Sequence, residues 1–74
     1  MKTLYDVQQL FKMYGIYIYL GKRIYDIELM EIELRNLHKA GLVDDQVFRT
    51  ALLVLRYEHR LEKKRELSLS KEEF

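Results

Sequence analysis

Four cations fall on one side of the helix predicted for residues 45–66, at spacings that suit contact with a phosphate backbone. They are Arg49, Arg56, Arg60 and Lys63. At about 100° per residue they occupy a narrow arc, bordered by Leu53 and Tyr57. Cations beside an aromatic ring favour single-stranded nucleic acid, because the cations contact phosphates and the ring stacks on a base. The alternative is an ordinary solvated helix surface, where three nearby glutamates weaken the positive field: Glu58, Glu62 and Glu66.

The segment between the first two predicted helices, residues 15–23, is the second candidate and is called the connector. Gly15 and Gly21 enclose alternating aliphatic and tyrosine residues, and Lys22 and Arg23 follow. The candidate binding residues of this segment are Tyr17, Tyr19, Lys22 and Arg23. Tyrosine and arginine also favour protein interfaces. The other interpretation is that the rings cover a thin core and leave their hydroxyls in water.

Catalytic chemistry has little support. His38 and His59 lie at the margins of predicted buried surfaces, and two imidazoles alone do not complete a zinc site. The chain has no cysteine, which excludes disulfides and thiolate metal ligands. Gly21 and Lys22 lack the remaining spacing of a phosphate-binding loop. We therefore expect a protein that is not an enzyme and that carries no metal or other cofactor.

Three helices must position these residues, at about 4–14, 24–40 and 45–66. Thr3 is a suitable N-cap for the first, and Asp6 places a negative charge in its first turn. Gly15 and Gly41 are suited to the left-handed residue that ends a helix. Ile16, Ile18 and Leu20 alternate with tyrosines, which predicts an extended connector rather than a paired strand. The expected architecture is an all-α, small antiparallel three-helix bundle with this connector between the first two helices.

The helix predicted for residues 24–40 carries two apolar stripes. Ile27, Met30, Leu34 and Leu37 form the first. Tyr25, Leu29 and Ile32, followed by Ala40, form the second on a different face. A helix that is apolar on two faces either contacts both other helices or contributes to an oligomer. Tyr25, Leu29 and Ile32 are therefore the candidate protein-interaction residues.

The third helix is predicted to outlast the bundle. Phe48, Ala51, Leu52 and Leu55 are expected to face the core, whereas Glu58 and Glu62 continue nearly the same face. Charged residues avoid a buried surface, so we expect packing to stop near His59. Residues 1–67 then form one domain, and residues 68–74 form a flexible C-terminal tail.

Composition limits the partners. Thirteen Lys and Arg residues oppose twelve Asp and Glu residues, for a net charge of +1. Only local patterning can therefore support nucleic-acid binding. No apolar run approaches the length of a signal peptide core or a membrane span, so no membrane partner is expected and the location is expected to be cytoplasmic.

Across about residues 3–60 the chain resembles the YqgQ-like family of short bacterial proteins of unknown function. The most specific part of the resemblance is Tyr5-Asp6-Val7-Gln8-Gln9-Leu10, followed by Gly15; further matches are Tyr19, Gly21, Arg23, Met30, Glu33-Leu34, Leu37, Ala51, Leu55-Arg56 and Glu58. The resemblance implies a compact three-helix bundle, a cytoplasmic location and an origin in low-GC Gram-positive bacteria. A role in binding single-stranded nucleic acid has been suggested for the family, and its genes tend to lie beside a glucokinase gene. The resemblance implies no catalytic residues.

Two functional hypotheses follow. The first is a small non-enzymatic module that binds single-stranded nucleic acid through the cations and tyrosines named above. The second is a protein-interaction or self-associating adaptor that uses the second stripe of residues 24–40 and the tyrosines of the connector. Salt separates them, because phosphate binding weakens steeply between about 50 and 200 mM salt, whereas an apolar interface changes little.

Overall fold

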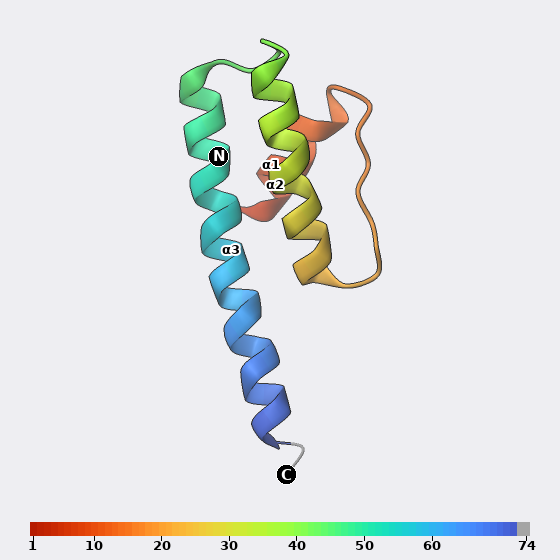
Figure 1. The fold of residues 1–74 in the computed structure, drawn as a ribbon, viewed down its shortest axis with the longest axis vertical. Helices are drawn as coiled ribbons and strands as arrows, with labels where there is room; N and C mark the ends of the chain where they lie inside the picture. Colours follow the sequence, from red (N-terminus) through yellow and green to blue (C-terminus); the bar gives the residue numbers. More distant parts are fainter. Residues whose placement is uncertain (73–74) are drawn as a thin grey trace.

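The computed structural model describes the backbone of residues 1–72 and the side chains of residues 1–68. Within this part the chain forms three helices and no strand: α1 (Leu4–Lys12), α2 (Arg23–Lys39) and α3 (Asp45–Glu72). The prediction of an all-α bundle is confirmed. Figure 1 shows α2 and α3 side by side as an antiparallel hairpin, with the connector running back along α2.

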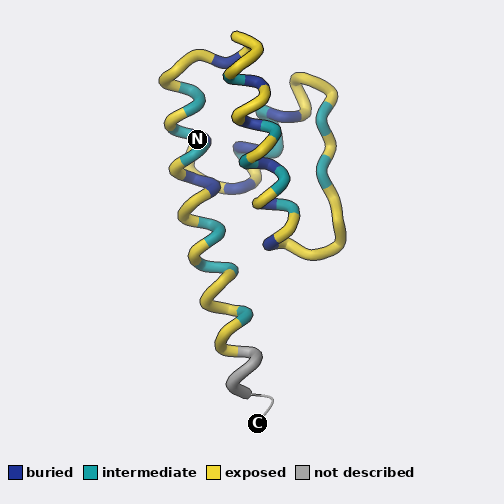
Figure 2. The backbone as a smooth tube through the Cα atoms, viewed as in Figure 1, coloured by how far each residue is buried: buried dark blue, intermediate teal, exposed yellow. Residues whose placement is uncertain are grey.

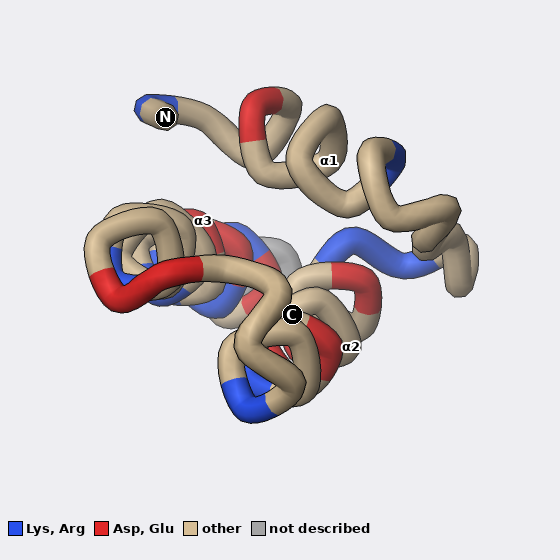
Figure 3. The backbone as a smooth tube through the Cα atoms, turned by 90° about the horizontal axis from the view of Figure 1, so that it is seen from above, with Lys and Arg blue, Asp and Glu red and all other residues tan. Residues whose placement is uncertain are grey.

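The position of α1 departs from the expected antiparallel arrangement. Figure 3 views the hairpin from one end and shows α1 lying across it. A helix of nine residues is only about 14 Å long at 1.5 Å per residue. Its buried side chains, Leu4, Val7 and Phe11, reach the shared core by crossing the hairpin. The antiparallel relation therefore holds for α2 and α3 and not for α1.

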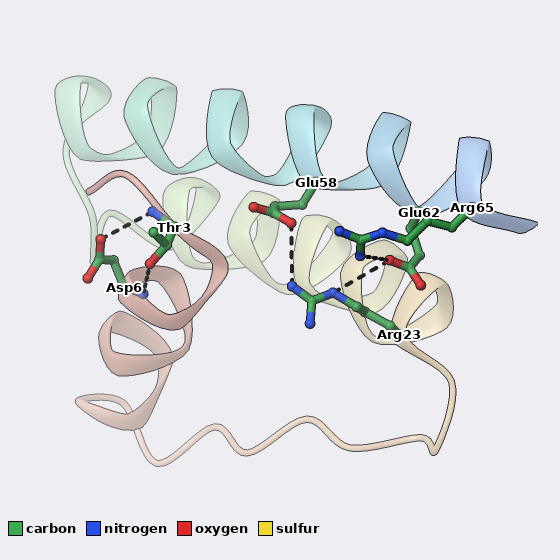
Figure 4. Close-up of polar contacts among 6 residues, drawn as sticks. All are labelled: Thr3, Asp6, Arg23, Glu58, Glu62 and Arg65. Carbon is green, nitrogen blue, oxygen red and sulfur yellow. Dashed lines mark hydrogen bonds and ion pairs between the residues drawn. The ribbon is translucent and has the colours of Figure 1, made fainter.

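The ends of the helices follow local rules. The Thr3 side chain accepts a hydrogen bond from the Asp6 backbone N–H at 3.3 Å. The backbone N–H groups of Lys2 and Thr3 donate to Asp6 Oδ2 at 2.9 and 3.2 Å, and Figure 4 shows this capping box. These backbone donors hold the pKa of Asp6 below its ordinary value. The predicted N-cap of α1 is therefore confirmed.

Glycines follow α1 and α2 as predicted, although α1 ends at Lys12 and not at residue 14. Gly15 and Gly41 have φ angles of 72° and 76°, a region where other residues are strained. Beyond them, the N–H groups of Ile16 and Leu42 each donate 3.0 Å hydrogen bonds to carbonyls of the preceding helix. At the start of α3, the Asp44 side chain accepts from the Val47 N–H at 2.8 Å. Asp44 therefore caps the N-terminus of α3.

One apolar core joins the three helices, and Figure 2 shows its buried segments facing inward. Its fully or nearly fully buried members are Leu4, Val7, Phe11, Ile27, Met30, Leu34, Leu37, Val43, Ala51, Val54 and Leu55. Burying one large side chain of this kind contributes roughly 1.5–3 kcal/mol. All four residues of the first stripe of α2 are in this core, so the stripe is buried as predicted. Phe48 and Leu52 are only partly buried against this core, and Val54, which was not predicted, is part of it.

The connector alternates as predicted, except at its end. Ile16 and Ile18 pack against the core, whereas Tyr17 and Tyr19 are 74% and 87% exposed. Leu20 was expected on the same side as the isoleucines but is exposed. Its backbone N–H donates to Asp26 Oδ1 at 2.6 Å, which turns the chain toward α2.

The C-terminal boundary of α3 is corrected. The helix was expected to end at residue 66 but continues to Glu72, whereas the flexibility expected of residues 68–74 stays a prediction. The sequence from Ser68 to Glu72 has neither glycine nor proline, so nothing in it ends a helix that is already formed. Residues 73 and 74 lie outside the described residues. Figure 1 shows α3 projecting well past α2, as predicted.

Candidate functional site

The four cations Arg49, Arg56, Arg60 and Lys63, called the basic stripe, are all exposed on the outer side of α3. Ala51 and Leu55, on the opposite side of the helix, are fully buried. Tyr57 is 51% exposed beside the stripe, and the Arg60 guanidinium carbon lies 6.0 Å from its ring centroid. This distance is at the limit of a cation–π contact. The stripe therefore presents cations next to an accessible aromatic ring, as the sequence predicted.

Three glutamates on the same helix, called the acidic row, face α2 instead. They are Glu58, Glu62 and Glu66. Arg23 at the start of α2 reaches two of them: its Nη2 lies 3.4 Å from Glu58 and its Nε 3.6 Å from Glu62 (Figure 4). The side chains of Glu58 and Glu62 are only 13% and 16% exposed. The acidic row is thus partly covered and compensated on the side of α3 that faces α2.

The buried core ends at Leu55, in agreement with packing that stops near His59. Ionic contacts continue past it, because Arg23 reaches Glu62 and Lys22 Nζ lies 3.5 Å from Glu66. Lys22 and Arg23 were predicted to join the tyrosines of the connector in a binding site. Both contact the acidic row but are 58% and 49% exposed, so that role stays a prediction. Sequence reasoning treated these residues separately because 35 positions divide Arg23 from Glu58.

The tyrosines of the connector lie apart from the basic stripe. In Figure 1 the connector runs along the side of α2 that is away from α3. Tyr17 and Tyr19 are exposed there and line an open cleft of ≈ 240 Å³ whose buried lining residues are Phe11 and Met30. The structure does not bring Tyr17 and Tyr19 together with the basic stripe. A single short ligand therefore meets either the basic stripe or the connector.

The second stripe of α2 faces mainly solvent. Tyr25 and Ile32 are 52% and 56% exposed, and Leu29 is half-buried. Lys22 Nζ lies 5.4 Å from the Tyr25 ring centroid. Of the two alternatives for a helix that is apolar on two faces, cover by the other helices does not apply to Tyr25 and Ile32, and an oligomer contact stays a prediction.

The seam between α2 and α3 carries charged contacts that sequence reasoning missed. Arg35 Nη2 donates to Glu31 at 3.0 Å, and Arg56 Nε lies 3.9 Å from the same carboxylate oxygen. The Glu31–Arg35 spacing of four residues is a recognisable helix pair. The participation of Arg56 could not be read from the sequence, since it depends on how α3 lies against α2.

Both histidines are also at this seam, each beside a carboxylate. His38 Nε2 lies 2.7 Å from Asp45, and its ring stacks on Phe48 with centroids 4.1 Å apart. His59 Nε2 lies 3.2 Å from Glu28. The hydrogen bond and charge of His38, with a smaller effect of Arg49, lower the pKa of Asp45. Each of these contacts connects α2 with the start or the middle of α3.

Comparison with known proteins assigns this chain to a family. The YqgQ-like family model matches residues 1–61. The chain belongs to the YqgQ-like family. It is also 41% identical over 58 residues to the uncharacterized protein YqgQ of Bacillus subtilis (strain 168), a match that covers 78% of this chain and 82% of that protein.

The family match includes most of the candidate site of this YqgQ-like chain. Arg49, Arg56, Tyr57 and Arg60 lie within residues 1–61, and Lys63 lies beyond them. Among the described residues of this family member, no group of three potential metal ligands is close enough to hold an ion. The helices of the described part are also too short or too polar to cross a membrane.

Proposed function

We propose that this YqgQ-like protein is a small, non-enzymatic, cytoplasmic module that binds single-stranded nucleic acid through the basic stripe and Tyr57. The observation that supports it is the separation of charge on α3. The basic stripe is exposed, and its member Arg56 lies 3.9 Å from Glu31 of α2, whereas Glu58 and Glu62 face α2 and contact Arg23. Although the chain as a whole is almost neutral, a strand on the outer side meets cations without the acidic row between them.

In the proposed mode of binding, the arginines contact backbone phosphates and Tyr57 stacks on one base. Phosphate contacts supply affinity without reading sequence. The half-exposed ring adds stacking, which every base permits. Binding is therefore expected to depend on single-strandedness and salt rather than on base order.

Titration of labelled oligothymidylate and of a duplex of equal length tests this function. Affinity for the single strand is expected to fall steeply between about 50 and 200 mM salt, because bound counterions compete with the arginines. The duplex serves as the control, and weaker binding to it is expected because its bases are already stacked. The proposal is contradicted if the affinity does not change with salt concentration, or if no binding is detected at about 50 mM salt.

Exposed apolar residues on α2 favour a second candidate, a protein-interaction or self-associating adaptor. Tyr25 and Ile32 are each more than half exposed, and Leu29 lies between them in the sequence. Such residues suit the centre of an interface. Sedimentation of the purified protein, with Ile32→Glu as the variant, tests self-association. A dimer that persists in high salt and dissociates in the variant supports the adaptor.

A further inference from the structure

One member of the basic stripe belongs to a contact that spans two helices. Arg35 of α2 and Arg56 of α3 both approach Oε1 of Glu31, at 3.0 and 3.9 Å. The arginine side chains are 45% and 55% exposed, whereas that of Glu31 is 29% exposed. Two guanidinium groups from different helices therefore converge on one carboxylate oxygen at the surface.

The charges of this group do not cancel. Two guanidinium groups and one carboxylate leave a net charge of one positive unit. Each guanidinium has five N–H donors, and a single carboxylate oxygen satisfies few of them. The planar arrangement of these donors suits a phosphate as well as a carboxylate. The site therefore has both the charge and the donors to accept a phosphodiester anion.

We propose that Arg35 and Arg56 form a phosphate clamp between α2 and α3, and that a backbone phosphate of the bound strand replaces Glu31 in it. The clamp rests on the proposed nucleic-acid function and extends its site from α3 onto α2. Glu31 holds the two arginines together in the free protein. Because ion pairs this exposed contribute little to stability, exchanging the carboxylate for a phosphate costs the fold little.

The clamp also sets the path of the strand. Arg60 lies one helical turn beyond Arg56, so a second phosphate contact follows along α3. The strand then crosses the α2–α3 seam at Glu31 and continues past Tyr57. A strand that follows this path contacts Arg35 of α2, whereas a strand that runs along α3 alone does not. Substitution of Arg35 therefore distinguishes the two paths.

Arg35→Ala is the first test, with Arg65→Ala as the matched control. Arg65 is also an exposed arginine paired with a glutamate of its own helix, at 2.9 Å from Glu62, but it lies beside the acidic row. Binding of labelled oligothymidylate of about 15 nucleotides is measured at several salt concentrations. The salt slope, the slope of the logarithm of affinity against the logarithm of salt concentration, is expected to fall in magnitude by about one unit in Arg35→Ala. Arg65→Ala is expected to leave the slope unchanged. Arg35→Lys keeps the charge, so it is expected to keep the slope while weakening affinity.

Glu31→Gln is the second test, and its control is Glu33→Gln, which makes the same change in net charge. Removing the competing carboxylate is expected to tighten binding by about two- to fivefold, the range set by an exposed ion pair. Glu33→Gln is expected to produce a smaller change. Circular dichroism of each variant establishes that the helices are intact.

The outcomes separate the clamp from the function on which it rests. If the parent protein binds the oligonucleotide but Arg35→Ala matches Arg65→Ala, the clamp is overturned and the basic stripe stands. If Glu31→Gln binds no more tightly than Glu33→Gln, Glu31 does not occupy the phosphate position and the clamp is likewise overturned. If the parent protein does not bind at about 50 mM salt, the nucleic-acid function fails and the clamp fails with it.

Discussion

The two sides of the C-terminal half of α3 carry opposite charges and meet different surroundings. The side facing α2 has Glu58 and Glu62, which are mostly covered and lie within 3.4–3.6 Å of Arg23. The outer side has Arg60 and Lys63, which are exposed to solvent. The same helix thus uses acidic residues to attach α2 and leaves its cations accessible. Charge on one side is expected to affect stability, and charge on the other to affect binding.

Removing two cations from the outer side is the strongest way to test this division. The double variant Arg56→Ala/Arg60→Ala is expected to lower the salt slope of oligonucleotide binding by about two units, one for each lost phosphate contact. Each exposed substitution is expected to change the free energy of unfolding by less than about 0.5 kcal/mol. Oligonucleotide titrations and urea denaturation measure the two effects.

The matched control is Lys12→Ala/Lys39→Ala, which removes the same charge from exposed positions on α1 and α2. Unchanged affinity in a well-folded Arg56→Ala/Arg60→Ala protein would exclude the outer side of α3 as the binding site. An equal loss in the control would mean that overall charge, rather than the basic stripe, governs binding.

Tyr57→Ala separates stacking from charge on the outer side. The variant is expected to lose about 1–3 kcal/mol of binding free energy for the stacked base, with little change in the salt slope. Tyr57→Phe keeps the ring and is expected to retain the affinity. Tyr19→Ala serves as the control from the connector, which lies along the other side of α2. Equal losses from Tyr19→Ala and Tyr57→Ala would contradict a site confined to α3.

Arg23→Ala tests the side of α3 that faces α2. The change leaves Glu58 and Glu62 partly covered without their shared cation, so the free energy of unfolding is expected to fall by about 1 kcal/mol. Oligonucleotide affinity is expected to change little. Arg60→Ala is the comparison, because it removes the same charge from the outer side. If urea denaturation shows that Arg60→Ala is the more destabilising variant, charge on the outer side of α3 contributes more to stability than charge facing α2, which contradicts the expectation.

The smallest expected effect is the pH dependence of stability that comes from Asp6. This residue lies in α1, away from both sides of α3. Backbone donors of Lys2 and Thr3 lower the pKa of Asp6 in the folded protein below 3.8. The unfolded chain therefore takes up the proton first as pH falls. This contribution to stability is present above about pH 4 and is lost as pH falls through the folded pKa.

Thermal unfolding of the parent protein and Asp6→Asn at several pH values measures this contribution. The parent protein is expected to lose more stability than the variant between about pH 5 and pH 2, because the amide does not titrate. Parallel curves would show that the capping box does not contribute to the pH dependence.

Much of the local structure of this chain was predictable because its causes lie within a few residues. The capping box at Thr3 and Asp6 depends on a three-residue spacing, and Gly15 and Gly41 supply the left-handed conformations that end two helices. The exposure of the basic stripe followed from helical periodicity opposite Ala51 and Leu55. The same local rules failed at the end of α3, where the lack of a helix-breaking residue outweighed the polar composition.

The contacts that define the candidate site depended on tertiary structure. Arg23 meets Glu58 and Glu62, and Arg56 meets Glu31, only because α2 and α3 lie antiparallel in one register. The crossing of α1 places three buried side chains of a short helix in the core shared by all three helices. The sequence by itself determined the number and approximate positions of the helices and which face of each helix is apolar, because these properties repeat along a single helix. Only the packing of the helices decided which charges are compensated and which remain open to a ligand, because the partners are far apart along the chain.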